Sequence, residues 1–259
     1  MNLKNIKLFL LDMDGTIYLD NELIDGALEF LEKINFQKKQ YIFLTNNSSK
    51  SKFDYLEKLN KLNIKANINN IFTSGMAMGI YLSKNFPNKS VYLVGTKALK
   101  KELLEYNIKF NNKNPNIVVV GFDRELNYKK LEKACEFIDR GATFLATNID
   151  YVCPIKNKRY IPDCGSICNM ITNATKKEAT FIGKPKPDMI NLLKEQYNLN
   201  NDEILMIGDR VYTDIACGYN ANVKTVCVLS GESTQKTIND STIKPDIVVD
   251  SIKNLIDLI

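Results

Sequence analysis

Two aspartates stand close together directly after an apolar run near the start of the chain. The run Leu8–Leu11 is followed by Asp12, a methionine, Asp14 and Gly15. Its residues do not alternate between polar and apolar, which indicates a strand covered on both faces, as in a parallel sheet. Gly15 permits a tight turn that brings Asp14 back toward Asp12. Two carboxylates this close raise each other's pKa unless a cation intervenes, and Mg2+ prefers such oxygen ligands.

Two other interpretations of this aspartate pair need to be weighed. In a calcium loop with Asp12, Asp14 and Gly15 at loop positions three, five and six, the first ligand position would fall on Leu10, which argues against that loop. An ordinary polar turn after a strand is the commoner role of an Asp-Gly pair. The pair alone therefore does not decide between a catalytic site and a turn.

The composition restricts the chemistry that the chain can use. Its 259 residues, 44% hydrophobic and 25% charged, are typical of a globular protein with one large or two ordinary domains. The sequence contains no histidine. Ser-His-Asp and Cys-His catalysis are thereby excluded, and zinc loses its commonest nitrogen ligand. Acid and base catalysis must come from carboxylates, Lys, Tyr or Cys.

Charge and cysteine content bear on partners and location. The surplus of 35 Lys and Arg over 30 Asp and Glu is spread along the chain without a basic, aromatic-rich stripe, so we expect no nucleic-acid partner. The six cysteines lie in or near apolar segments, which favours reduced thiols in a cytoplasmic protein, with a Cys164–Cys168 pair left open. No apolar run is long enough for a signal peptide or a membrane span, so we expect no membrane partner.

A second apolar run, Tyr41–Leu44, also ends on polar side chains. It is followed by Thr45 and Asn46, the first two of five consecutive hydroxyl or amide residues. A helix N-cap needs one or two such residues, and Ser51 fits the start of a helix. The others can donate hydrogen bonds to phosphate oxygens.

Lys184 and Asp209 extend the pattern toward the end of the chain. Lys184 stands between a glycine and a proline, which would hold its ammonium group as a point charge for phosphate, although most loop lysines are simply solvated. Asp209 follows the apolar run 204–207 and a glycine. Asp214 lies beyond the turn, where it either supports Asp209 or caps the next helix.

These polar groups occupy equivalent positions in the predicted fold. Asp12, Thr45, Lys184 and Asp209 each lie at or just after the end of a predicted strand. In an open parallel sheet, ligands bind at the carboxyl ends of the strands. The four ends supply a carboxylate nucleophile, neutral donors, a fixed cation and a further metal carboxylate, which are the parts that phosphoryl transfer needs.

A second α/β pattern lies between residues 76 and 180, without polar strand ends. We therefore predict a catalytic core at 1–75 and 181–259 and an inserted α/β cap domain at 76–180. The elements predicted for the insertion are Met76–Leu82, Val91–Val94, Lys97–Tyr106, Ile117–Val120, a helix from Tyr128, and Thr143–Ala146. The further elements predicted for the core are helices at Gly26–Ile34 and Ser251–Ile259 and strands at Lys224–Leu229 and Asp246–Val249.

The stretch 147–165 is predicted to be a long polar loop, because it combines prolines with mixed charges. Loops of this length are often lids or specificity elements. The first candidates for contacts with the substrate are Lys156, Lys158, Arg159 and Tyr160.

In order and spacing, the motifs resemble those of the haloacid dehalogenase superfamily along the whole chain. The matching segments are Asp12–Thr16, Leu44–Asn46, Lys184, and Gly208-Asp209 with Asp214. An insertion that contains Ala146–Asp150 and leads to Gly183-Lys184-Pro185 is similar to the NagD-type branch with a C2 cap. That branch contains 4-nitrophenyl phosphatases and phosphatases of sugar phosphates, phosphoglycolate and pyridoxal phosphate.

The resemblance implies a Rossmann-like, doubly wound parallel sheet of the α/β class with an inserted cap. It implies Asp12 as the nucleophile and Asp14 as general acid and then general base. Mg2+ would be held by Asp12, the backbone carbonyl of Asp14 and Asp209. Asp214 would support these ligands without binding Mg2+ itself.

The resemblance also implies that Thr45, Asn46 and Lys184 bind the phosphoryl group. We therefore expect a cytoplasmic, Mg2+-dependent phosphatase of small phosphomonoesters that works through an aspartyl phosphate, with a homodimer through the cap as a further expectation. A phosphomutase and a slow phospho-ligand sensor stay open as alternatives. A dehalogenase is disfavoured, because it uses neither a metal nor Asp14. Relatives often have Pro-Gly where this chain has the segment 162–165, so the substrate preference is left open.

Overall fold

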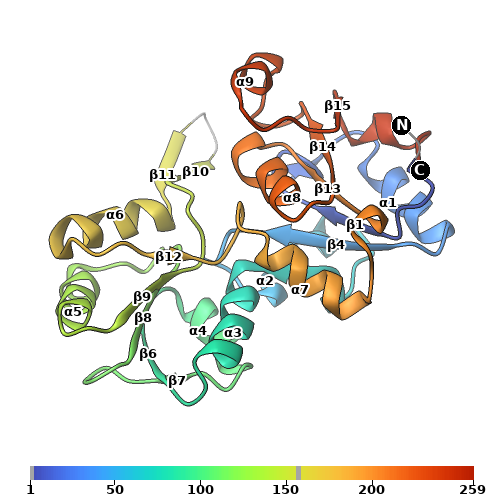
Figure 1. Cartoon of the computed structure of the whole chain (residues 1–259). Helices are drawn as coiled ribbons and strands as arrows, with labels where there is room; N and C mark the ends of the chain where they lie inside the picture. Colours follow the sequence, from blue (N-terminus) through green and yellow to red (C-terminus); the bar gives the residue numbers. More distant parts are fainter. Residues whose placement is uncertain (1–2, 156–158) are drawn as a thin grey trace. The chain divides into compact units, whose positions relative to one another are not determined.

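The computed structural model describes residues 3–155 and 159–259, which fold into two compact units (Figure 1). The first unit comprises Met1–Thr45, Leu56–Phe72 and Lys184–Ile259, and the second comprises Asn46–Tyr55 and Thr73–Gly183. The predicted cap at 76–180 differs from the second unit chiefly at residues 46–55, and the domain boundaries stay a prediction.

The first unit is built on a parallel sheet. Its strands lie in the order β15-β14-β13-β1-β4-β5. The strands are β1 (Leu8–Leu11), β4 (Gln40–Thr45), β5 (Ile71–Thr73), β13 (Ile204–Gly208), β14 (Lys224–Val228) and β15 (Ile247–Val249). Strand β1 pairs in parallel with both β13 and β4. All four of its residues are buried, as the unbroken apolar run predicts for a strand covered on both faces.

Short elements complete the first unit. Strands β2 (Tyr18–Leu19) and β3 (Glu22–Leu23) form an antiparallel pair. The helices are α1 (Ala27–Phe36), α7 (Asp188–Tyr197), α8 (Ala216–Asn220), α9 (Gln235–Asp240), a π-helix at Val211–Ile215, and 3₁₀ helices at Ile68–Asn70, Asn201–Glu203 and Ile252–Leu255. Helix α2 (Lys52–Lys61) includes residues of both units, and Ser51 precedes it as predicted.

The closing helix predicted over Ser251–Ile259 was wrong. Only Ile252–Leu255 is helical there, as a 3₁₀ turn that buries Ile252 and Leu255. So short a segment gains too few backbone hydrogen bonds to offset the cost of starting an α-helix.

The second unit has its own parallel sheet. Its strands lie in the order β12-β9-β8-β6-β7, with parallel pairing throughout. The strands are β6 (Ser90–Val94), β7 (Lys109–Phe110), β8 (Ile117–Val120), β9 (Thr143–Ala146) and β12 (Thr180–Phe181). The helices are α3 (Ser74–Asn85), α4 (Lys97–Leu104), α5 (Tyr128–Asp139) and α6 (Cys164–Thr175). Helices α5 and α6 pack their apolar faces into one core with strands β6, β8 and β9.

The predicted loop at 147–165 was wrong over most of its length. Strands β10 (Val152–Ile155) and β11 (Arg159–Pro162) form an antiparallel hairpin, and Asp163 then caps α6. In a hairpin, the two neighbouring strands form hydrogen bonds with each other. These strands therefore form although their prolines and charges are not typical of a strand sequence. Arg159 and Tyr160 lie exposed on β11, whereas the predicted contacts of Lys156 and Lys158 lie outside the described residues.

Two other sequence expectations concern the membrane and the cysteines. Among the described helices, none is long and apolar enough to cross a membrane. Cys164 and Cys168 are both buried thiols in α6 and are not joined in a disulfide.

Candidate active site

The central strands of the first unit bring two aspartates to the same edge of the sheet. Asp12 directly follows β1, and Asp209 directly follows the neighbouring strand β13. The backbone N–H of Asp12 donates to the carbonyl of Ile207 at 2.9 Å, which continues the parallel ladder to the strand end. The carboxyl ends of parallel strands meet at one edge, so both side chains face the place where ligands bind in such folds.

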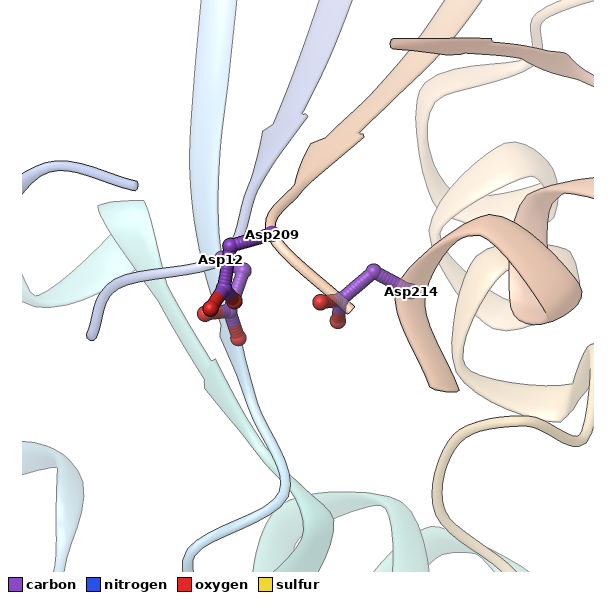
Figure 2. Close-up of side chains that lie close together, drawn as sticks. All are labelled: Asp12, Asp209 and Asp214. Carbon is purple, nitrogen blue, oxygen red and sulfur yellow. The ribbon is translucent and has the colours of Figure 1, made fainter. Parts of the chain in front are cut away.

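Asp214 joins these two aspartates in a cluster. Figure 2 shows Asp12 and Asp209 beside each other at the strand ends and Asp214 opposite them, on the helical segment that follows. One oxygen from each of the three carboxylates lies within 4.8 Å of the others. The side chain of Asp12 is 16% exposed, while Asp209 and Asp214 are almost fully buried.

Lys184 places its ammonium group against this cluster. Its Nζ donates to Asp12 Oδ1 at 2.7 Å, to Asp214 Oδ1 at 2.6 Å and to the carbonyl of Leu44 at 3.0 Å. The ammonium group thus has three oxygen atoms within hydrogen-bond distance, which fix its position. With only 2% of its side chain exposed, Lys184 is an internal cation that offsets part of the cluster's negative charge.

The proximity of these groups shifts their pKa values. Burial, followed by repulsion from Asp214, raises the pKa of Asp12 well above its usual range, although Lys184 opposes this shift. Burial and Asp214 likewise raise the pKa of Asp209 to about 7. Burial alone would lower the pKa of Lys184, but Asp12 and Asp214 outweigh burial and raise it. Without a further cation, the cluster therefore carries more negative charge than its environment stabilises.

The surroundings of Asp209 fit a divalent cation. Oδ2 of Asp209 accepts the N–H of Glu232 at 2.7 Å, whereas Oδ1 is buried and has no hydrogen-bond partner among the described residues. A Cβ added at Gly15 or Gly231 would come within 2.5 and 2.1 Å of Asp209 Oδ2, so only glycine leaves room for this carboxylate. A buried carboxylate oxygen without a donor, beside two other carboxylates, is a typical environment for a hard cation.

Asp14 occupies a more open position than Asp12. Its side chain is 52% exposed, and Lys58 Nζ lies 3.7 Å from its Oδ1. The same ammonium group stands 3.6 Å from the centre of the Tyr18 ring, which holds it near Asp14. The turn depends on Gly15, whose φ of 86° is left-handed and whose N–H donates to the carbonyl of Tyr18 at 2.8 Å.

The predicted phosphate donors lie at the end of β4 and in the residue after it. Thr45 is the last residue of β4 and is buried. Asn46 begins the second unit, where its Nδ2 donates to Asp150 Oδ2 at 2.7 Å. The structure thus gives Asn46 a carboxylate partner that the sequence did not predict.

The structure specifies contacts for Asp214 that the sequence left open. Its Oδ1 accepts from Lys184, and its Oδ2 accepts the backbone N–H of Arg210 at 3.0 Å. A Cβ added at Gly208 would lie 2.3 Å from Asp214 Cβ, so glycine is required before Asp209. Asp214 therefore holds Lys184 in place.

A group of residues after strand β14 also supports the site, although the sequence did not predict it. Ser230 Oγ donates to the carbonyl of Gly15 at 2.7 Å, and the Glu232 carboxylate forms an ion pair with Arg210, whose Nε lies 2.8 Å from Glu232 Oε2. Together with Gly231, these residues support both the Gly15 turn and Asp209. The signal was available, because they follow the end of a predicted parallel strand, as Asp12 and Asp209 do.

The shifted pKa of Asp209 predicts how stability depends on pH. Its folded-state pKa of about 7 exceeds the ordinary value of 3.8, so the folded protein binds this proton more tightly than the unfolded chain. The contribution to stability is complete below pH 4 and is lost as the pH rises through 7. Thermal unfolding in a chelator should therefore show a contribution that declines over this range.

Asp209→Asn is the control for this pH dependence. The variant should flatten the decline, and saturating Mg2+ should oppose it in the original protein, because a bound cation favours the ionised carboxylate. Equal pH dependence of the original protein and the variant would contradict the assignment.

The parallel sheet and the aspartate cluster at its carboxyl edge define a hydrolase with a Rossmann-like core. The chain belongs to the haloacid dehalogenase-like hydrolase family. The profile of that family matches residues 9–109, and a HAD-hydrolase-like profile matches residues 181–255.

Several relatives are similar over nearly the whole chain. Acid sugar phosphatases of Staphylococcus saprophyticus and of Staphylococcus aureus strain MRSA252 are 32% and 34% identical, with 98% and 94% of both chains covered. Among solved structures, a 4-nitrophenylphosphatase from Thermotoga maritima superimposes with a TM-score of 0.95 at 37% identity over 98% of both chains. NagD from Escherichia coli K-12 gives a TM-score of 0.89 at 30% identity, with 96% of this chain and 97% of NagD covered. The predicted NagD-like branch is confirmed.

Proposed function

We propose that this chain is a Mg2+-dependent phosphatase that hydrolyses small phosphomonoesters through an aspartyl phosphate on Asp12. The observation that carries the proposal is the cluster of Asp12, Asp209 and Asp214 around the buried Lys184 at the carboxyl edge of the sheet. The similarity to acid sugar phosphatases supports sugar phosphates as the first substrates to test, ahead of phosphoglycolate and pyridoxal phosphate.

In the first proposed step, a carboxylate oxygen of Asp12 attacks phosphorus. A bond forms between this oxygen and phosphorus while the bond from phosphorus to the ester oxygen breaks. Asp14 gives its proton to the departing alcohol. The half-exposed position of Asp14 suits proton exchange with substrate and water, and Lys58 holds its carboxylate near the Gly15 turn.

In the second proposed step, water attacks phosphorus in the aspartyl phosphate. Asp14, now ionised, accepts a proton from this water, and the bond between phosphorus and the Asp12 oxygen breaks. Inorganic phosphate leaves and the Asp12 carboxylate is restored. The covalent intermediate divides one very slow hydrolysis into two faster steps.

The chain's own cation and donors would orient the phosphoryl group. Lys184 is fixed beside Asp12 by three hydrogen bonds, so its charge is in place before the substrate arrives. Thr45 ends the strand next to β1 and Asn46 follows it, and both are proposed to donate to phosphate oxygens.

Asp12, Asp209 and the backbone carbonyl of Asp14 are the proposed Mg2+ ligands, while Asp214 stays bound to Lys184. When bound, Mg2+ would supply positive charge that favours the ionised carboxylates and polarises a phosphoryl oxygen. The buried, donor-free Oδ1 of Asp209 supports this assignment.

The test of the proposed function is phosphate release from 4-nitrophenyl phosphate and from a panel of sugar phosphates, measured with Mg2+ and with a chelator. We expect turnover with Mg2+, its loss in the chelator, and its recovery when Mg2+ is returned. Transfer of phosphate to a second sugar hydroxyl would indicate a phosphomutase instead. Absence of turnover across the panel, together with failure to bind beryllium fluoride, would favour a phospho-ligand sensor.

A further inference from the structure

The second unit begins and ends beside two proposed phosphate-binding residues. Its first residue, Asn46, follows Thr45, and its last residue, Gly183, precedes Lys184. Whatever fixes Asn46 and Gly183 within the second unit therefore constrains the chain that carries Thr45 and Lys184.

A buried chain of amides and carboxylates holds Asn46. Its Nδ2 donates to Asp150 Oδ2 at 2.7 Å, and Nδ2 of Asn148 donates to the same oxygen at 2.9 Å. Asn148 Nδ2 also lies 3.1 Å from Asp163 Oδ1, the residue that caps α6. None of these four residues is more than 9% exposed. Because the acceptors are carboxylates in a buried setting, these hydrogen bonds are of the strong, charge-assisted kind.

The opposite side of the Asn46 amide faces Gly183. A Cβ added at Gly183 would come within 2.6 Å of Asn46 Oδ1 and 2.5 Å of the carbonyl of Thr147. The N–H of Gly183 donates to that same carbonyl at 2.8 Å. The Asn46 amide thus lies between the Asp150 carboxylate and the Gly183 backbone.

This arrangement fixes the orientation of the Asn46 side-chain amide. A carboxylate only accepts hydrogen bonds, so Asp150 selects the orientation with Nδ2 toward itself and Oδ1 toward Gly183. The backbone of Asn46 is fixed as well, because its carbonyl accepts from Ser74 Oγ at 2.6 Å.

We propose that Asp150 is a positioning residue for phosphoryl transfer, which acts through Asn46 and which Asn148 holds in place. The inference rests on the proposed function, in which Asn46 binds the phosphoryl group. Asp150 keeps the Asn46 amide in one orientation and keeps it packed on Gly183, directly before Lys184.

A double-mutant cycle with 4-nitrophenyl phosphate tests the inference. Asp150→Ala and Asn46→Ala should each lower kcat/KM by about 10- to 100-fold, the range that loss of a hydrogen bond to a charged group supports. If Asp150 acts through Asn46, the double variant should be no worse than Asn46→Ala. A carboxylate with a purely structural role would instead reduce kcat/KM by the same factor in both backgrounds.

Asp123→Ala is the matched control. Asp123 is also a buried aspartate of the second unit, and it pairs with Lys130 at 2.7 Å outside the network of Asn46. This variant should keep kcat/KM within about 2-fold of the original protein if it stays folded, because the changed group does not contact Asn46.

The outcomes separate the inference from the proposed function. If the two substitutions lower kcat/KM by independent factors that multiply in the double variant, the role of Asp150 is overturned. Turnover by the original protein would still support the phosphatase. Absence of turnover by the original protein would overturn both. If thermal unfolding shows that Asp150→Ala is unfolded, Asp150→Asn replaces it, since it keeps the size and one acceptor oxygen. That variant should lose less activity, again only when Asn46 is present, and full activity would overturn the inference.

Discussion

Asp12→Asn is expected to abolish steady-state phosphate release, with kcat lowered by at least about 10⁴-fold, as for other covalent nucleophiles. An amide of the same size has no carboxylate oxygen to attack phosphorus. The fold should persist, because the variant removes one charge from a cluster in which burial and Asp214 already raise the pKa of Asp12. The measurement is steady-state and single-turnover hydrolysis of 4-nitrophenyl phosphate.

Asp14→Asn is the matched control for the nucleophile, because it changes the other aspartate of the pair in the same way. The 4-nitrophenolate ion leaves without needing a proton, so this variant should still release a burst of 4-nitrophenol as the aspartyl phosphate forms. Later turnover should be slow, because no general base activates water. A similar burst from Asp12→Asn would contradict the assignment of Asp12. So would a turnover of Asp12→Asn above about 1% of that of the original protein.

Lys184→Met should be the most destabilising of the proposed substitutions. It leaves Asp12, Asp209 and Asp214 close together without their internal cation, and breaking a buried ion pair in this way costs about 3–5 kcal/mol. For a chain of this size, the melting temperature should fall by about 10 °C. Activity should also fall, because the phosphoryl group loses a preorganised positive charge. Thermal unfolding and kinetics together measure both effects.

Lys253→Met is the control that separates the effect of burial on an ion pair from the effect of the pairing itself. The Lys253–Asp25 pair has the same 2.7 Å distance as Lys184–Asp12, but both of its side chains are largely exposed. Exposed pairs contribute little, so this variant should keep its melting temperature and activity. Mg2+ should stabilise Lys184→Met, since the cation would replace part of the missing charge. A melting temperature of Lys184→Met equal to that of the original protein would refute the buried ion-pair account.

The sequence by itself restricted the possible chemistry and predicted the parallel core. The absence of histidine restricted acid and base catalysis to groups such as carboxylates. The unbroken apolar runs before Asp12, Thr45 and Asp209 predicted buried parallel strands, and β1, β4 and β13 have that form. These signals are local, because the burial of a strand on both faces is recorded in its own residues.

Only the tertiary structure decided which side chains meet. Lys184 contacts Asp12 across 172 residues of sequence and Asp214 across 30, and Asn46 contacts Asp150 across 104. Such contacts depend on strand order, on the turns and on the packing around them, none of which is recorded in the local pattern of either partner. The hairpin of β10 and β11 could not be predicted from the local sequence for the same reason, because each of these strands is stabilised by pairing with the other.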